Sequence, residues 1–360
     1  MTAFPPKYYP TLCIRRGEMV GLEHLDEETK DLLLPIILFS PWMGSHQLAN
    51  SHQRIERAFG NRDIILDLDR HYSSRSNVQS RLDFRALVSG DDSHLRWVDL
   101  IASHENYIPT VQIVGNTEDQ ISHQLSAFSE MGRGVVLRAN LSNTHELARL
   151  DYSLGYYIDR DETDLLVVLD VNYQADTTVS AVSAAGVIDR VLETAPFAKF
   201  VVTEPNFPNS FGDFDPEGRL PIASVQVHQA LPERFSNYPI YYGDWASTKP
   251  RYLDQGGGGV SPIPHIELPT DDSWLIFRSS REDMSYAQVA RRIILTEEWA
   301  DRPFTWGTGM IERAAGDGGG ISTGPDAIAA RVNIHLFMQA HRDNPERRQQ
   351  VITTDWIDPI

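Results

Sequence analysis

Short apolar runs recur along the chain, and most are continuous and do not alternate with polar residues. Continuous runs are typical of strands buried on both faces, as in a parallel sheet. Amphipathic stretches separate most of these runs. The pattern predicts eight strands, at Thr11–Arg15, Pro35–Phe39, Asp63–Leu68, Ile108–Ile113, Gly134–Arg138, Leu165–Asp170, Phe200–Thr203 and Ile240–Gly243.

Helix signals lie between these strands. Thr117 is a suitable N-cap because Gln120 follows three residues later, and Gly132 is a suitable stop. Strands that alternate with helices favour an α/β fold with a parallel sheet, and eight units within residues 1–245 favour a (β/α)8 TIM-like barrel over an open doubly wound sheet. The predicted helices in this region are Leu22–Leu33, Thr117–Met131, Ala175–Thr194 and Ser224–Phe235.

The pattern changes after residue 245. We expect residues 246–360 to form a C-terminal α+β extension packed on the barrel. Gly256–Gly259 is interpreted as a mobile loop, because no Lys-Ser or Lys-Thr follows it as in a nucleotide-binding P-loop. The extension is predicted to contain a hairpin of Ile263–Leu268 and Trp274–Arg278, followed by helices at Ser285–Trp299 and Pro325–His341.

Composition and net charge limit the classes of function and the cellular locations that we expect for this chain. The 360 residues carry a formal net charge of −18, which disfavours nucleic-acid binding because phosphate backbones are repelled. Cys13 is the single cysteine, so no internal disulfide forms. The longest apolar stretch, Leu32–Phe39, is far shorter than the roughly 20 residues of a membrane span. With no signal peptide visible, we expect a cytoplasmic protein without a membrane segment.

Charged residues follow several of the predicted strands. The C-terminal ends of barrel strands meet at one rim, and active sites of barrels form there. Asp67 and Asp69 share a face, because side chains on a strand alternate with a period of two. Candidate catalytic residues are Asp67, Asp69, Asp170 and Asp244, candidate anion-binding residues are Arg16 and Arg138, and candidate supporting residues are Glu18, His71, Asn140 and Glu204.

This set of residues has two interpretations. In the first, the arginines bind phosphate or carboxylate, and a carboxylate or His71 acts as general base. The carboxylates would also suit a hard cation such as Mg or Mn, although no particular metal is indicated. In the second interpretation, the same residues are a network of salt bridges that holds the rim together.

Several motifs resemble the Beta protein family of phages and bacteria, in the same order and over nearly the whole chain. They are a Tyr-x-Pro strand, Arg16-Gly17-Glu18, the Pro-Ile-Ile strand at Pro35, Leu66-Asp67-Leu68, Gly134–Arg138, Leu169-Asp170, Asn206-Phe207-Pro208, Tyr242-Gly243-Asp244 and the Trp274–Arg278 strand. The chain departs from the family pattern at two places. The pattern has an acid at the end of the second strand, where this chain has Phe39-Ser40, and small residues before the Phe-Pro after the seventh strand, where this chain has Glu204-Pro205. The resemblance implies a setting in phage–host conflict but no settled activity.

Three functions are compatible with these observations. The leading hypothesis is an enzyme, a hydrolase of a phosphate-containing substrate such as a nucleotide, with a small anionic ligand at the rim. The alternative is a non-catalytic binding or scaffold protein that recognises a protein partner through the extension. A nucleic-acid enzyme would need a basic groove from Arg281, Arg291, Arg292, Arg347 and Arg348, which we interpret instead as solvated helix faces.

Overall fold

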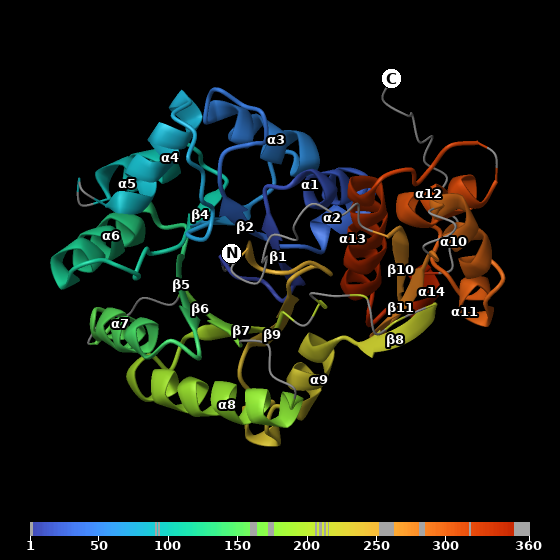
Figure 1. Cartoon of the computed structure of the whole chain (residues 1–360). Coiled ribbons are helices and arrows are strands. Elements are labelled where there is room, and N and C mark those ends of the chain that lie inside the picture. The colour runs from blue at the N-terminus through green and yellow to red at the C-terminus, as the bar shows by residue number, and fades with distance from the viewer. Residues whose placement is uncertain are drawn as a thin grey trace.

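The computed structural model describes residues 3–90, 92, 94–158, 164–171, 176–205, 207–208, 211, 214, 216–251, 263–280, 285–316 and 318–348. Within them, eight parallel strands form one sheet in the order β4-β3-β2-β1-β9-β7-β6-β5. Helices surround this sheet, as Figure 1 shows. Gly256–Gly259 and Arg281, singled out from the sequence, lie outside the described residues.

The strands of the large sheet confirm all eight predicted positions, with ends shifted by a few residues. β4 is the shortest strand, with three residues, and only Ile108 and Pro109 of the predicted Ile108–Ile113 region belong to it. The strands are β1 (Tyr9–Cys13), β2 (Ile36–Phe39), β3 (Ile64–Leu68), β4 (Tyr107–Pro109), β5 (Val135–Asn140), β6 (Leu165–Asp170), β7 (Lys199–Thr203) and β9 (Ile240–Asp244).

The sheet closes between its two edge strands. Thr110, directly after β4, forms a parallel bridge with Val136 of β5, and the amide of Val111 donates to the carbonyl of Val136 at 2.9 Å. The closed parallel sheet and the surrounding helices make a (β/α)8 barrel, as the sequence predicted. The bridge joins the two edge strands, so the sheet is nearly closed at this seam.

Helices cover the outside of the barrel. α6 begins with the predicted capping box of Thr117 and Gln120 and ends at Gly132. The predicted helix Leu22–Leu33 is instead two helices, because the Asp26 side chain accepts from the Thr29 amide and starts a new one. The barrel helices are α1 (Arg16–Glu23), α2 (Glu27–Asp31), α3 (Ala49–Phe59), α4 (Gln79–Ser89), α5 (Leu95–Ala102), α6 (Glu118–Met131), α7 (Thr144–Gly155), α8 (Thr177–Thr194), α9 (Ala223–Ala230) and the 3₁₀ helix η2 (Glu233–Phe235).

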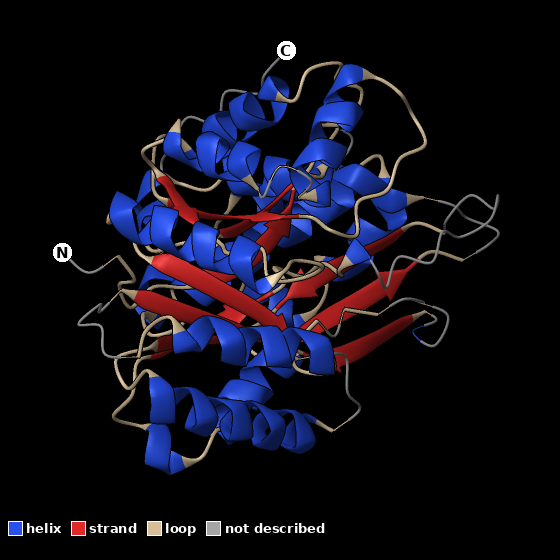
Figure 2. Cartoon of the chain, turned by 90° about the vertical axis from the view of Figure 1, so that its left-hand side faces the viewer, coloured by secondary structure: helices blue, strands red, loops and turns tan. Residues whose placement is uncertain are grey.

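The C-terminal region adds a second, antiparallel sheet. The predicted hairpin is present as β10 and β11, and a third strand, β8, comes from the segment between β7 and α9. Figure 2 shows the small sheet and its helices stacked beside the barrel. These elements are β8 (Glu217–Pro221), β10 (His265–Pro269), β11 (Ser273–Arg278), α10 (Tyr286–Ile293), α11 (Glu297–Ala300), α12 (Trp306–Ala315), α13 (Gly324–Ala340) and α14 (Pro345–Arg348).

Helix α13 packs into two hydrophobic clusters, one in the barrel and one beneath the small sheet. Its Val332 and Leu336 pack into the barrel cluster, whereas Ile334 and Met338 pack into the cluster beneath the small sheet. In Figure 1, α13 accordingly lies between α1 and β10. No helix among the described residues is long and apolar enough to cross a bilayer.

Glycines allow α1 and α13 to approach closely. A Cβ atom on Gly21 would lie 2.8 Å from the Ala329 carbonyl oxygen and 2.9 Å from Val332. Both contacts are shorter than van der Waals separation, and one of them is with backbone. The packing of the extension on the barrel therefore requires glycine at position 21.

We predict that Gly21→Ala lowers the free energy of unfolding by about 1–3 kcal/mol, because the methyl group overpacks the α1–α13 contact. Gly186→Ala is the matched control, since no atom lies within 4 Å of a Cβ at that position in α8. It should raise stability by about 0.5–1 kcal/mol through helix propensity. Urea titrations measure both changes, and equal effects would contradict the close approach of α1 and α13.

Candidate functional site

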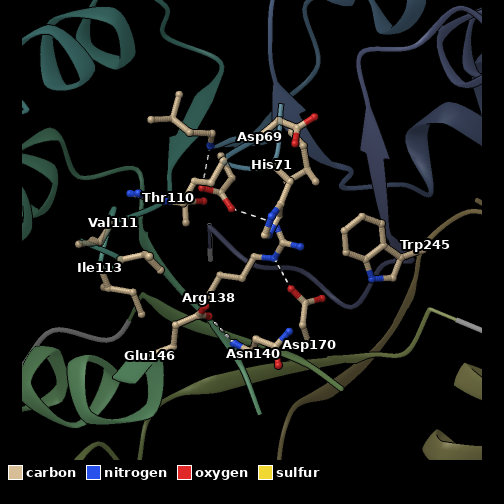
Figure 3. Close-up of a pocket in the computed structure, with 15 residues that line it drawn as sticks. Asp69, His71, Thr110, Val111, Ile113, Arg138, Asn140, Glu146, Asp170 and Trp245 are labelled. Carbon is tan, nitrogen blue, oxygen red and sulfur yellow. Dashed lines mark hydrogen bonds and ion pairs between the residues drawn. The ribbon is translucent and has the colours of Figure 1, made fainter. Parts of the chain in front are cut away.

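A cavity of about 90 Å³ opens at the C-terminal ends of the barrel strands. Figure 3 shows that its polar side chains point toward one another from strands on different sides of the barrel. The volume is several times that needed by one water molecule. The lining residues are Leu38, Asp67, Leu68, Asp69, Arg70, His71, Thr110, Val111, Ile113, Val114, Arg138, Asn140, Glu146, Asp170 and Trp245.

Strand periodicity explains which side chains enter the cavity. Ile65, Val136 and Val168 belong to the cluster that fills the barrel interior. Because side chains alternate between faces, Asp67 and Asp170 also point inward, one step further along their strands. The inward side chains therefore change from apolar to charged at the ends of β3, β5 and β6.

Arg138 lies at the centre of this group. Its Nη1 donates to an Asp67 oxygen at 2.9 Å, and its Nε donates to an Asp170 oxygen at 2.6 Å. The guanidinium carbon also lies 5.3 Å from the centre of the Trp245 ring. Asp67 and Asp170 are nearly buried, and together they raise the pKa of Arg138 above its usual range despite burial. The guanidinium is thus permanently charged and fixed in orientation.

The second oxygen of Asp67 extends the network to Arg70. This oxygen accepts from Gln112 Nε2 at 2.8 Å and from the Leu68 amide at 2.8 Å. The other side of the Gln112 amide accepts from Arg70 at 2.8 Å. A second arginine is therefore held at the cavity through a neutral side chain.

Asp170 and Glu146 form the opposite wall. Thr203 donates its hydroxyl to Asp170, and the Asn140 amide donates to Glu146 at 2.7 Å. Burial raises the pKa of Glu146, and the Asn140 hydrogen bond offsets part of that shift. Glu146 is therefore the carboxylate of this wall that is easier to protonate than usual.

His71 lines the cavity (Figure 3) and is also exposed to solvent. Partial burial lowers the pKa of His71, with Asp69 opposing and Arg138 adding to the shift. The lowered pKa means that the imidazole is mainly neutral at pH 7. A neutral imidazole can accept a proton, as general base catalysis requires.

Asp69 has an arginine partner that sequence reasoning missed. Arg251, which follows β9 by several residues, forms an ion pair with Asp69 and lies 3.4 Å from the Ser40 hydroxyl. Its guanidinium also lies 5.2 Å from the ring centre of Tyr72. Residue spacing gave no signal for this contact, because the chain must return over the rim to make it.

Glu18 is buried outside the cavity. It accepts from the Cys13 amide and lies 3.6 Å from Arg15. Burial raises the pKa of Glu18 from about 4.5 to about 7, against the opposing effect of Arg15. Glu18 therefore changes its charge near neutral pH without lining the cavity.

Three other predicted site residues also lie away from the cavity lining. Asp244 is buried and accepts from His335 Nε2 at 2.7 Å and Tyr242 at 2.9 Å. Glu204 lies in a smaller void on the other side of Trp245, and Arg16 is largely exposed with Asp326 at 3.8 Å. Of the predicted set, the structure thus gathers Asp67, Asp69, His71, Arg138, Asn140 and Asp170 around one cavity.

Among the described residues, no group of three or more His, Cys, Asp or Glu side chains is arranged to hold a metal ion. The guanidinium of Arg138 lies between Asp67 and Asp170. That is the position in which a cation would balance the two carboxylates. The structure therefore offers no support for assigning Mg or Mn to this rim.

The fold and the site define a (β/α)8 barrel protein with an arginine held between carboxylates at its C-terminal rim. The chain belongs to the Beta protein family, whose sequence model matches residues 8–341. It is also 27% identical over 342 residues to "Protein beta" of Enterobacteria phage P4, covering 92% of each chain. The family resemblance inferred from the motifs is thereby confirmed.

The raised pKa of Glu18 predicts a pH-dependent stability. The folded protein favours neutral Glu18, so its contribution is fully present below about pH 4.5 and is lost as pH rises through about 7. Glu18→Gln removes this loss. We predict that the variant gains stability over the wild type by up to about 3 kcal/mol at pH 8 and little at pH 4.5, measured by urea unfolding. A difference in stability that does not change with pH would contradict the assignment of a raised pKa to Glu18.

Proposed function

We propose that the rim cavity binds a small ligand through a phosphate or carboxylate group. The observation that carries this proposal is the guanidinium of Arg138, which lies in the cavity wall and is fixed by two carboxylates and Trp245. A fixed guanidinium loses little side-chain entropy when it binds an anion. Arg70 supplies a second positive charge at the same cavity.

The cost of burying these charges supports binding over a purely structural role. A buried ion-pair network is often no more stable than apolar residues of similar volume. The barrel interior just below is filled by such residues, including Ile65, Val136 and Val168. The change to charged residues occurs where the cavity opens, which is the place where a ligand would contact them.

We predict that Arg138→Lys weakens binding of inorganic phosphate by roughly tenfold or more, because lysine keeps the charge but loses the planar fork. Arg149→Lys is the matched control, since Arg149 on α7 pairs with Glu118 at the surface, 3.5 Å away. Isothermal titration calorimetry measures both variants. Wild-type protein that binds neither phosphate nor acetate would overturn the proposal.

Hydrolysis of a phosphate-containing ester, such as a nucleotide, is the reaction that we propose for this site. Each of Asp67, Asp69 and Asp170 already faces an arginine, so His71 is the better general base. In this mechanism His71 takes a proton from water as its oxygen attacks phosphorus. The ester P–O bond breaks, the leaving oxygen takes the bonding electron pair and gains a proton from solvent, and Arg138 stabilises the negative charge that develops on the phosphoryl group.

We predict that His71→Gln lowers the rate of phosphate-ester hydrolysis by about 100-fold or more while phosphate affinity stays within about twofold. Glutamine keeps a polar side chain of similar size but cannot act as a base. The measurement is release of phosphate from nucleotides and from 4-nitrophenyl phosphate. Phosphate binding without hydrolysis would favour the alternative, a non-catalytic binding protein that recognises a partner.

The biological setting that we propose is phage–host conflict, with support from the phage origin of a relative that aligns with 92% of the chain. The same His71→Gln variant tests this setting. Phage plating efficiency should differ between bacteria that produce the wild type and bacteria that produce the variant. Equal plating efficiency at equal protein levels would mean that hydrolysis by this site has no part in phage–host conflict.

A further inference from the structure

Two charged side chains of the rim cavity, Arg70 and Glu146, take no part in its ion pairs. Both line the cavity, and within the described part of the chain their hydrogen-bond partners are neutral groups. The other lining carboxylates, on Asp67, Asp69 and Asp170, each pair with an arginine. The cavity therefore holds one positive and one negative charge that remain available to a ligand.

Arg70 has hydrogen-bond donors to spare. A guanidinium carries five N–H groups, and among the described residues Arg70 donates to Gln112 alone, from Nη2 at 2.8 Å. Burial lowers the pKa of Arg70, and the negative charges of Asp67 and Glu146 oppose that shift. An arginine stays protonated at physiological pH even so. Arg70 can therefore donate to a phosphate, whereas Arg138 already gives two N–H groups to aspartates.

Glu146 has acceptor positions left for a cation. Its carboxylate accepts from the Asn140 amide at 2.7 Å and from Asn143 Nδ2 at 2.8 Å, with one bond to each oxygen. Figure 3 shows Glu146 beside Asn140 in the cavity lining. Each carboxylate oxygen can accept two hydrogen bonds, so each keeps one position for a donor such as an ammonium group.

The balance of charge favours a ligand that carries both signs. Carboxylates outnumber arginines in the cavity lining, so a purely anionic ligand adds to an excess of negative charge unless a proton binds with it. A ligand with its own positive charge needs no such proton. Arg70 and Glu146 also act on each other through space without forming an ion pair, so one small molecule can contact both.

We propose that the ligand of the rim cavity is a zwitterion, namely a small phosphate ester whose alcohol part carries a protonated amine. Its phosphate lies beside Arg70 and Arg138, and its ammonium group lies beside Glu146. The cavity volume of about 90 Å³ requires a short carbon chain between the two groups. This inference rests on the proposed function of the rim cavity and adds the class of ligand.

The first test compares two esters of nearly equal size on the wild-type protein. In 2-aminoethyl phosphate, an ammonium group replaces the terminal methyl group of propyl phosphate, so the two esters differ mainly in that charge. Calorimetric titrations at about pH 7 keep the amine protonated. The contact with Glu146 should make the amino ester bind roughly tenfold or more tightly than propyl phosphate. Equal affinities, or tighter binding of propyl phosphate, would overturn the inference.

The second test removes the negative charge of Glu146. Glu146→Gln keeps an oxygen that can accept from the Asn140 amide. Asp151→Asn is the matched control, because Asp151 lies on the same helix α7 but pairs with Arg190 at the surface, 2.9 Å away. We expect Glu146→Gln to bind the two esters with similar affinity, and Asp151→Asn to retain the preference for the amino ester.

The third test addresses the phosphate end of the ligand. Arg70→Gln should lower the affinity for both esters by a similar factor, roughly tenfold, because both carry the same phosphate group. A loss confined to the amino ester would contradict the position of the phosphate beside Arg70.

These outcomes distinguish failure of this inference from failure of the proposed function. Wild-type protein that binds neither ester nor inorganic phosphate contradicts phosphate binding at the rim. Protein that binds inorganic phosphate but does not prefer the amino ester contradicts the zwitterion alone. An unchanged preference in folded Glu146→Gln protein contradicts the role of Glu146. If that variant does not fold, the ratio of the two affinities on the wild type still decides the inference.

Discussion

The contact of Arg138 with Asp67 and Asp170 is the interaction on which the site depends. It joins the ends of β3, β5 and β6, and those ends meet only because the barrel closes between β4 and β5. Removing one partner would leave a buried charge uncompensated, at a cost of about 3–5 kcal/mol. The geometry of the rim is therefore fixed by charge pairing, while the interior below it is fixed by apolar packing.

A second polar contact ties the extension to the barrel. Asp244, at the end of β9, accepts from Tyr8, Tyr242, the Ala246 amide and His335 of α13. Burial alone would raise the pKa of Asp244, but these hydrogen bonds and His335 lower it. Asp244 therefore stays ionised and holds α13 against the strand end, which gives this carboxylate a positioning role away from the cavity.

The sequence predicted the barrel because buried parallel strands leave continuous apolar runs that are visible without any structure. The site was predicted less accurately, because residues at the strand ends were grouped without asking whether each side chain lies on the inward or the outward face of its strand. Asp244 follows Tyr242, which belongs to the outward face of β9, so strict period-two counting would have set it apart from Asp67 and Asp170. No local pattern indicates Gln112 or Arg251, since both reach the site through long-range contacts.

Charge balance also bears on the anion binding that we propose for the cavity. Four carboxylates, Asp67, Asp69, Glu146 and Asp170, line it together with two arginines, and Arg251 adds a third from outside. An arriving phosphate adds negative charge to this cluster, so proton uptake would reduce the repulsion. Glu146, whose pKa is raised by burial, is the carboxylate best placed to accept that proton. Arg138 can then keep both aspartate partners while it faces the ligand, which allows binding without loss of the contact that orders the rim.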